Sequence, residues 1–116
     1  MAKKICVIKT SLRLNSNSDQ LADAFIQSAK ESGNDVIEIS LKDKKIAFCK
    51  GCLGCQKLGH CVIDDDANII TEKIKQADVI VWATPIYYYE MSGQMKVMID
   101  RANSLYTSNY QFRDVY

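Results

Sequence analysis

The stretch DVIVWATP, residues 78–85, is the clearest strand in the chain. It is a short and almost continuously apolar run, rich in β-branched residues, and Pro85 ends it. KKICVIK, residues 3–9, has the same character, which is typical of a strand covered on both faces in a parallel sheet. DVIEIS, residues 35–40, predicts a further strand between them. We therefore expect three strands.

A helix is expected after the first strand. Ser16 and Asp19 stand at capping-box spacing, and Gly33 supplies the stop. Apolar positions recur every four residues and are flanked by two more: Leu21, Phe25 and Ala29, with Ala22 and Ile26.

Two more helices are expected nearer the C-terminus. One starts at residues 64–66 and carries a single apolar stripe: Ala67, Ile70, Ile74 and Ala77. The other starts at about Ser92 and has five apolar positions at helical spacing: Met95, Met98, Ile99, Ala102 and Leu105. The alternation of strands and helices predicts an α/β fold with a parallel sheet and right-handed crossovers. Ligands of such sheets bind beyond the carboxyl ends of the strands, where the strand order reverses, so the loops leaving the first and third strands are the candidate site.

Composition limits the class of protein. The 116 residues, 47% hydrophobic and 25% charged, suffice for one domain over residues 1–116 with a real core. A formal net charge of +1 with scattered Lys and Arg predicts no nucleic-acid partner. The apolar run that follows Lys4 is too short for a signal peptide or a membrane span. We expect a cytoplasmic, reducing location and no membrane association.

Polar and aromatic side chains gather in the two candidate loops. TSLRLNSNS, residues 10–18, precedes a helix, whose free N–H groups and dipole favour a bound anion; an ordinary capped helix is the alternative interpretation. The loop at residues 83–93 carries Pro85 and three tyrosines, which suit either the wall of a site for a planar ligand or a hydrophobic turn. A phosphate cradle beside an aromatic wall at a switch point is what flavin mononucleotide (FMN) requires.

Both loops resemble segments of a known family. TSLRLNSNS resembles the G-S-x-R-x-x-S-N-[ST] phosphate loop of the NAD(P)H-dependent FMN reductases, which have a flavodoxin-like fold. ATPIYYYEMSGQMKVMIDR, residues 83–101, resembles that family's S-P-[IV]-Y-x-x-x-x-x-[GA]-x-[LM]-K-x-x-[IL]-D-R segment. The resemblance implies a doubly wound parallel sheet in three layers, and an oxidoreductase that passes electrons from NAD(P)H through FMN to an acceptor.

The resemblance also implies roles for single residues. The residues implied to hold the FMN phosphate are Ser11, Arg13, Ser16, Asn17 and Ser18. Those implied to border the isoalloxazine ring are Pro85, Ile86, Tyr87 and Tyr88. No catalytic acid, base or nucleophile is implied, because the flavin carries the electrons. Thr10 replaces the family's usual glycine, so its backbone is expected to approach the phosphate less closely. Lys96, Asp100 and Arg101 match the family too, although a solvated helix face or a subunit contact explains them equally well.

Four cysteines, Cys49, Cys52, Cys55 and Cys61, have C-x2-C-x2-C-x5-C spacing. Ferredoxins use such compact runs for a [4Fe–4S] cluster, whereas zinc sites more often use two separate C-x2-C pairs. A reducing location and an odd count of five cysteines disfavour disulfides. The motif and its position resemble those of iron–sulfur flavoproteins, a branch of the same family, which implies a cluster on the four thiols. Other reductases of the family keep a similar loop without a cluster, so redox-sensitive loop thiols remain the alternative.

The strand count is low for a flavodoxin-like domain, whose five strands follow the order 2-1-3-4-5. This sequence supplies three, and residues 111–116 resemble the start of a fourth. We therefore expect the fold to be truncated after the third strand and its helix, with that strand as an exposed edge that joins a second copy in a homodimer.

Three functions remain in competition at this point. The first is an FMN-dependent NAD(P)H oxidoreductase. The second is an electron carrier in which a [4Fe–4S] cluster, fed by ferredoxin, passes electrons to FMN. The third is a cofactor-free domain that acts as an oligomerising or interaction module through its exposed edge.

Overall fold

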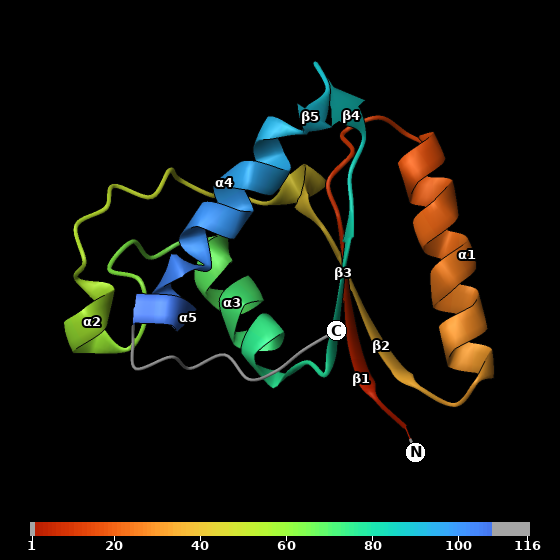
Figure 1. Cartoon of the computed structure of the whole chain (residues 1–116), viewed down its shortest axis with the longest axis horizontal. Coiled ribbons are helices and arrows are strands. Elements are labelled where there is room, and N and C mark those ends of the chain that lie inside the picture. Colours follow the sequence, from red (N-terminus) through yellow and green to blue (C-terminus); the bar gives the residue numbers. More distant parts are fainter. Residues whose placement is uncertain (1, 108–116) are drawn as a thin grey trace.

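Three parallel strands form the centre of the computed structural model, which describes residues 2–107 (Figure 1). They are β1 (Lys4–Lys9), β2 (Asp35–Ser40) and β3 (Val79–Ala83), in the order β2-β1-β3. β1 pairs on both sides, with Val7 opposite Glu38 and Val81. The three strands expected from the sequence are confirmed. The chain turns to one side of β1 for β2 and then crosses to the other side for β3, so the loops leaving β1 and β3 lie side by side.

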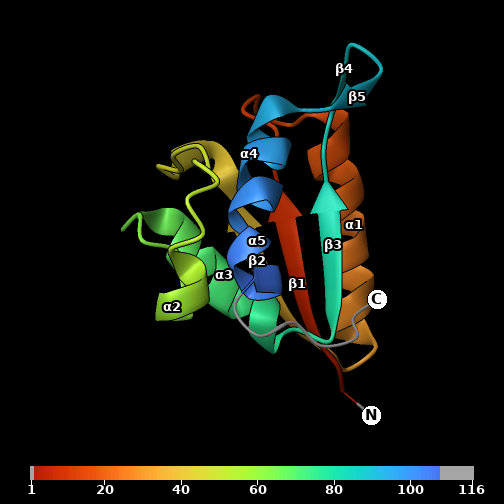
Figure 2. The ribbon, with the colours of Figure 1, turned by 60° about the vertical axis from the view of Figure 1, so that its left-hand side comes forward.

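Helices cover both faces of this sheet. α1 (Asn17–Glu31) lies on one face, while α3 (Asp66–Gln76) and α4 (Gly93–Arg101) lie on the other (Figures 1 and 2). The shorter elements are η1 (Leu41–Asp43), α2 (Cys55–Leu58), α5 (Asn103–Thr107) and an antiparallel hairpin of β4 (Ile86–Tyr87) and β5 (Glu90–Met91). The three-layer α/β arrangement is therefore the expected one.

The two faces of β1 enter two separate cores. Cys6 and Ile8 pack among side chains of α3 and α4, whereas Ile5 and Val7 pack among those of α1. Successive side chains of a strand point to opposite faces, so a strand with both faces covered must be apolar at every position. This is why KKICVIK shows no polar alternation.

The apolar residues of α1 divide between its buried and its exposed face. Leu21 and Phe25 are 75% and 40% exposed, while the buried residues are Ala22, Ile26 and Ala29. Both sets have helical spacing, and a rotation of about 100° separates neighbouring positions. Of the five apolar positions identified in the sequence, Ala22, Ile26 and Ala29 therefore face the sheet, whereas Leu21 and Phe25 do not.

The last predicted helix is divided in two. α4 ends at Arg101, and the N–H of Ala102 donates to the carbonyls of both Met98 and Ile99 before α5 begins. Ser92 caps α4 as its position suggested, with its Oγ accepting the N–H of Met95.

Within residues 2–107, β3 pairs with β1 along one edge and has no strand on its other edge. The predicted start of a fourth strand, residues 111–116, lies outside the described residues. Among the described helices, none is both long and apolar enough to cross a membrane.

Candidate functional site

A cavity of about 540 Å³ lies between the loop after β1 and the loop after β3. Its lining residues are Ser11, Arg13, Ser16, Asn17, Ser18, Leu21, Thr84, Pro85, Ile86 and Tyr87. The fold thus brings together all five residues expected at a phosphate and three of the four expected at a flavin ring. Leu21 and Thr84 are lining residues that the sequence motifs did not single out.

Hydrogen bonds within the loop shape the polar end of this cavity. Ser11 Oγ accepts the N–H of Arg13 (3.2 Å) and closes a tight turn. Ser16 Oγ accepts the N–H of Asp19 (3.2 Å) and caps α1. The helix offers no carbonyl to the N–H groups of Asn17 and Ser18, because they lie in its first turn. These donors, the helix dipole and the Arg13 charge together favour an anion.

The other end of the cavity is formed by Pro85, Ile86 and Tyr87, which present an apolar and aromatic wall. Small-molecule sites have volumes of about 300–1,000 Å³, so the cavity has the size for a nucleotide-like ligand. One end suits a phosphate and the other a flat ring. The residues present therefore fit FMN.

Thr10 lies beside the cavity but does not line it. Its side chain is 1% exposed, and its Oγ1 donates to the carbonyl of Ala83 (3.0 Å). Its N–H donates to the same carbonyl (3.0 Å). The side chain that replaces the family's glycine is therefore accommodated inside the protein rather than in the ligand cavity.

Tyr88 and Tyr89 form the tip of the β4–β5 hairpin. Both have positive φ, 51° and 64°, and their side chains are 86% and 97% exposed. Tyr88 is absent from the lining of the cavity, unlike its neighbour Tyr87. Positive φ costs a tyrosine about 1–2 kcal/mol, so the tip is held in a strained turn.

The four predicted metal ligands surround one small hollow. Cys49, Cys52, Cys55 and Cys61 line it, and it has a volume of about 20 Å³. That is room for about one water molecule. Within the described residues, no three His, Cys, Asp or Glu side chains come close enough together to hold a metal ion. The thiols share a site, but the loop as it lies does not fit a cluster, and the sulfurs would have to converge.

Main-chain groups already point at two of these sulfurs. The N–H of Gly51 donates to Cys49 Sγ (3.4 Å), and that of Ile63 donates to Cys61 Sγ (3.5 Å). Gly54 is needed at the start of α2, since a Cβ there would lie 2.5 Å from Val62 Cγ1. This close approach packs the middle of the cysteine run against Val62, the residue that follows Cys61.

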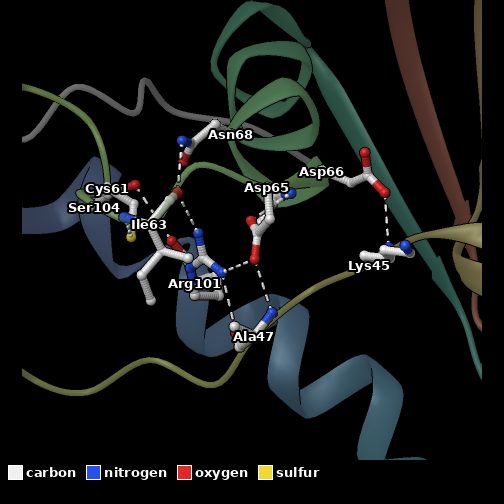
Figure 3. Close-up of polar contacts among 10 residues, drawn as sticks. Lys45, Ala47, Cys61, Ile63, Asp65, Asp66, Asn68, Arg101 and Ser104 are labelled. Atoms are coloured by element: carbon white, nitrogen blue, oxygen red, sulfur yellow. Dashed lines mark hydrogen bonds and ion pairs between the residues drawn. The ribbon is translucent and has the colours of Figure 1, made fainter.

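Arg101 reaches from α4 into the cysteine loop and ties its two stems together (Figure 3). Its Nη1 donates to the carbonyl of Ala47 (3.0 Å) and pairs with Asp65 Oδ2 (2.7 Å). Its Nη2 donates to the carbonyl of Ile63 (3.1 Å). Ala47 and Ile63 flank the cysteine run, so one guanidinium holds both of its ends. Arg101 is 2% exposed, and the suggestion that it lies on a solvated helix face is wrong.

Electrostatics stabilises this clamp. Burial raises the pKa of Asp65, but the hydrogen bonds from Arg101, Ala47 and Ala67 and the guanidinium charge outweigh it, so the pKa is lowered from its ordinary value. Burial likewise opposes the charge of Arg101, yet the hydrogen bond with Asp65 and the charge of the neighbouring Cys61 raise its pKa. Both groups stay charged in the ordinary pH range. A cation therefore stands permanently beside the sulfur of Cys61.

Known proteins resemble nearly the whole chain. The sequence model of the family described as NADPH-dependent FMN reductase matches residues 3–115. An iron–sulfur flavoprotein of Methanosarcina thermophila is 33% identical over 111 residues, which is 96% of this chain and 58% of the relative. The iron–sulfur flavoprotein MJ1083 of Methanocaldococcus jannaschii is 35% identical, over 88% of this chain and 53% of the relative. The chain thus spans about half the length of these curated relatives.

Solved structures share the fold. An NAD(P)H:quinone oxidoreductase from Methanothermobacter marburgensis superposes with a TM-score of 0.72 over 88% of this chain and 53% of that protein, at 15% sequence identity. At this identity the likeness concerns the fold alone. It confirms the flavodoxin-like architecture that the resemblance of the two loop segments implied.

Proposed function

The chain belongs to the NADPH-dependent FMN reductase family, and on that premise we propose that it binds FMN and passes electrons from NAD(P)H through the flavin to an acceptor. The observation that carries the proposal is the cavity of about 540 Å³, whose lining joins a polar helix terminus to an aromatic wall. Bound FMN supplies the redox chemistry itself.

The residues of the chain bind and orient the flavin in this proposal. Ser11, Ser16 and Ser18 supply hydroxyl groups at the phosphate, beside the first N–H groups of α1. Arg13 supplies the neutralising charge. Pro85, Ile86 and Tyr87 lie against the ring and exclude water from one side of it.

The test is a titration of the purified chain with FMN and, separately, with riboflavin, which lacks the phosphate, followed by quenching of flavin fluorescence. Arg13→Gln is expected to weaken FMN binding about tenfold and to leave riboflavin binding unchanged, because a charged hydrogen bond is lost. Lys30→Gln is the matched control, since it removes the same charge from the other end of α1 and leaves both affinities unaltered.

Two experimental outcomes would favour a different function. A colourless chain that does not respond to FMN contradicts it and favours a cofactor-free interaction module. If the chain binds FMN but does not oxidise NADH or NADPH with added flavin, the function is that of an electron carrier supplied by a protein donor such as ferredoxin.

We propose, as the finer assignment, that the four thiols around the small hollow bind a [4Fe–4S] cluster once the loop closes on it. The support is their shared hollow, the two N–H groups that point at Cys49 and Cys61, and the names of the relatives. Amide N–H groups directed at sulfur stabilise thiolate ligands. The cation of Arg101 beside Cys61 offsets the negative charge of a thiolate-bound cluster.

Iron and sulfide analysis of protein purified without oxygen tests the cluster. We expect about four irons and four sulfides per chain, with a broad visible absorption that bleaches on reduction. Cys55→Ser is expected to remove the iron and keep FMN binding, whereas Cys6→Ser, at a buried core position, should keep the iron. Flavin absorption without iron would make the four cysteines loop thiols.

A further inference from the structure

Three hydroxyl groups meet in the interior between the two loops of the flavin cavity. They belong to Thr10, at the end of β1, to Thr84, just after β3, and to Ser92, just before α4. Thr10 is 1% exposed and Ser92 is fully buried. Burying a hydroxyl group costs free energy unless it forms hydrogen bonds. The hydrogen-bond partners of these three hydroxyl groups therefore show which segments they connect.

The first half of the network joins β1 to α4. Ser92 Oγ donates to Thr10 Oγ1 (3.3 Å), and Thr10 Oγ1 donates to the carbonyl of Ala83 (3.0 Å). Thr10 therefore accepts from one side and donates to the other. Eighty-two residues separate Thr10 from Ser92 in the chain, so this contact is purely tertiary.

The second half joins α4 to the aromatic loop. The N–H of Ser92 donates to Thr84 Oγ1 (3.0 Å), and Thr84 Oγ1 donates to the carbonyl of Pro85 (2.8 Å). Ser92 Oγ also accepts the N–H of Met95 and so caps α4. The start of the phosphate loop, the start of the aromatic loop and the start of α4 are thereby fixed to one another.

We propose that this Thr10–Ser92–Thr84 network sets the spacing between the phosphate loop and the aromatic wall, and that Thr10 is a positioning residue for FMN. The inference rests on the proposed function, because it concerns the same cavity. Thr10 does not line the cavity, since its side chain is buried and donates to the carbonyl of Ala83. Its effect reaches the ligand through the placement of the two loops.

The affinity for a ligand that contacts both loops depends on the spacing between them. FMN places its phosphate on one loop and its ring on the other, so its affinity depends on how well both ends can be bound at once. Riboflavin engages the aromatic wall alone and does not depend on the position of the phosphate loop. Loss of the network therefore weakens FMN binding selectively, whereas general loosening of the fold weakens both.

The decisive variant is Thr10→Val, which keeps the branched shape and removes the hydroxyl. We expect the dissociation constant for FMN to rise about tenfold, as for the loss of two buried hydrogen bonds, and that for riboflavin to stay unchanged. Thr10→Ser keeps the hydroxyl and should restore FMN binding. Thr71→Val is the matched control, because Thr71 is also a buried threonine but donates within its own helix to Asn68 (3.0 Å).

Amide hydrogen exchange without ligand gives an independent measurement. Thr10→Val is expected to speed exchange about tenfold at residues 11–13 and at residues 91–92, while residues 66–76 of α3 keep their rates. Unchanged FMN affinity in Thr10→Val, or an equal loss for FMN and riboflavin, overturns the inference. If the unaltered chain binds no FMN, the proposed function fails, and the exchange rates alone decide whether the network couples the loops.

Discussion

Arg101 carries a full charge on a side chain that has no exposed surface, and Asp65 is its ionic partner. The pair ties α4 to the segment that starts α3, and it closes the stems of the cysteine loop at the same point. Removing one partner from a buried pair leaves the other charge without compensation, which costs about 3–5 kcal/mol. We therefore expect the Arg101–Asp65 ion pair to contribute strongly to the stability of the cysteine loop.

The substitution Asp65→Asn is expected to lower the free energy of unfolding by about 3 kcal/mol, because Arg101 then lacks its counter-charge. Urea unfolding followed by circular dichroism measures the change. Asp64→Asn is the matched control, since Asp64 is exposed and its replacement should alter stability by less than about 0.5 kcal/mol. Equal effects of the two substitutions would show that the ion pair contributes little.

The same carboxylate predicts a pH dependence. The pKa of Asp65 is lower in the folded chain than in the unfolded one, so its contribution to stability is present above the unfolded value of about 3.9 and is lost as pH falls through the lower folded value. We expect unfolding free energy to decrease below about pH 5 more steeply in the unaltered chain than in Asp65→Asn. Parallel slopes in this range would contradict the pKa shift.

Residue-level prediction from the sequence depended on how far apart the interacting groups lie. The Ser16 cap was predictable, because its acceptor role toward Asp19 is set by a spacing of three residues. Arg101 and Thr10 were not, since their partners lie tens of residues away and their burial depends on the packing of separate elements. The nearest available signal for Arg101 was its match to the family segment.

At the scale of elements, the β4–β5 hairpin stands out because its two turn residues are both tyrosines with positive φ. Such two-residue turns favour Asn-Gly, which adopts this backbone with little strain. The rings of Tyr88 and Tyr89 lie 6.0 Å apart, but that contact offsets little of the strain. Strain of this kind persists where the side chains serve a purpose other than stability.

The double substitution Tyr88→Asn with Tyr89→Gly is therefore expected to stabilise the chain by about 2–4 kcal/mol, seen as a higher Tm. Tyr88→Ala with Tyr89→Ala removes the same rings but keeps the strained backbone, so it should not raise Tm. If both double variants have the same Tm, relief of backbone strain is not the cause.

The apolar periodicity of a helix does not always determine which of its faces is buried. The apolar stripe of α3 was predictable, because its buried residues form one series with no competitor. In α1 two adjacent series have helical spacing, and the structure buries Ala22, Ile26 and Ala29. Periodicity identified the helix but could not select its buried face.

On the scale of the whole molecule, the order of the strands determines the position of the candidate flavin cavity. The order β2-β1-β3 places the loops after β1 and β3 next to each other, and the cavity lies between them. The sequence was sufficient for this step, because the rules for parallel sheets turn strand order into site position. It was not sufficient for the cysteine loop, whose shape depends on tertiary contacts with α4.

Within residues 2–107 no strand pairs with the outer edge of β3, and we predict a dimer joined through that edge. The N–H of Thr10 donates to the carbonyl of Ala83 (3.0 Å), and Ala83 lies opposite Lys9, so the main-chain groups of Ala83 point toward β1. Because hydrogen-bonding directions alternate along a strand, the N–H groups of Val79 and Val81 also face β1, while those of Ile80 and Trp82 face the free edge. Exposed apolar edges of this kind pair with further strands, and two copies related by a two-fold axis would form one continuous sheet.

Sedimentation velocity over a concentration range on the order of 1–100 μM, with hydrogen exchange on the same samples, tests the dimer. We expect the mass to double with concentration and hydrogen exchange at Ile80 and Trp82 to slow in step with it. Val79 and Val81 serve as internal controls, because their N–H groups face β1 and are protected at every concentration. A monomer at every concentration, or a dimer in which Ile80 and Trp82 still exchange rapidly, would contradict pairing through this edge.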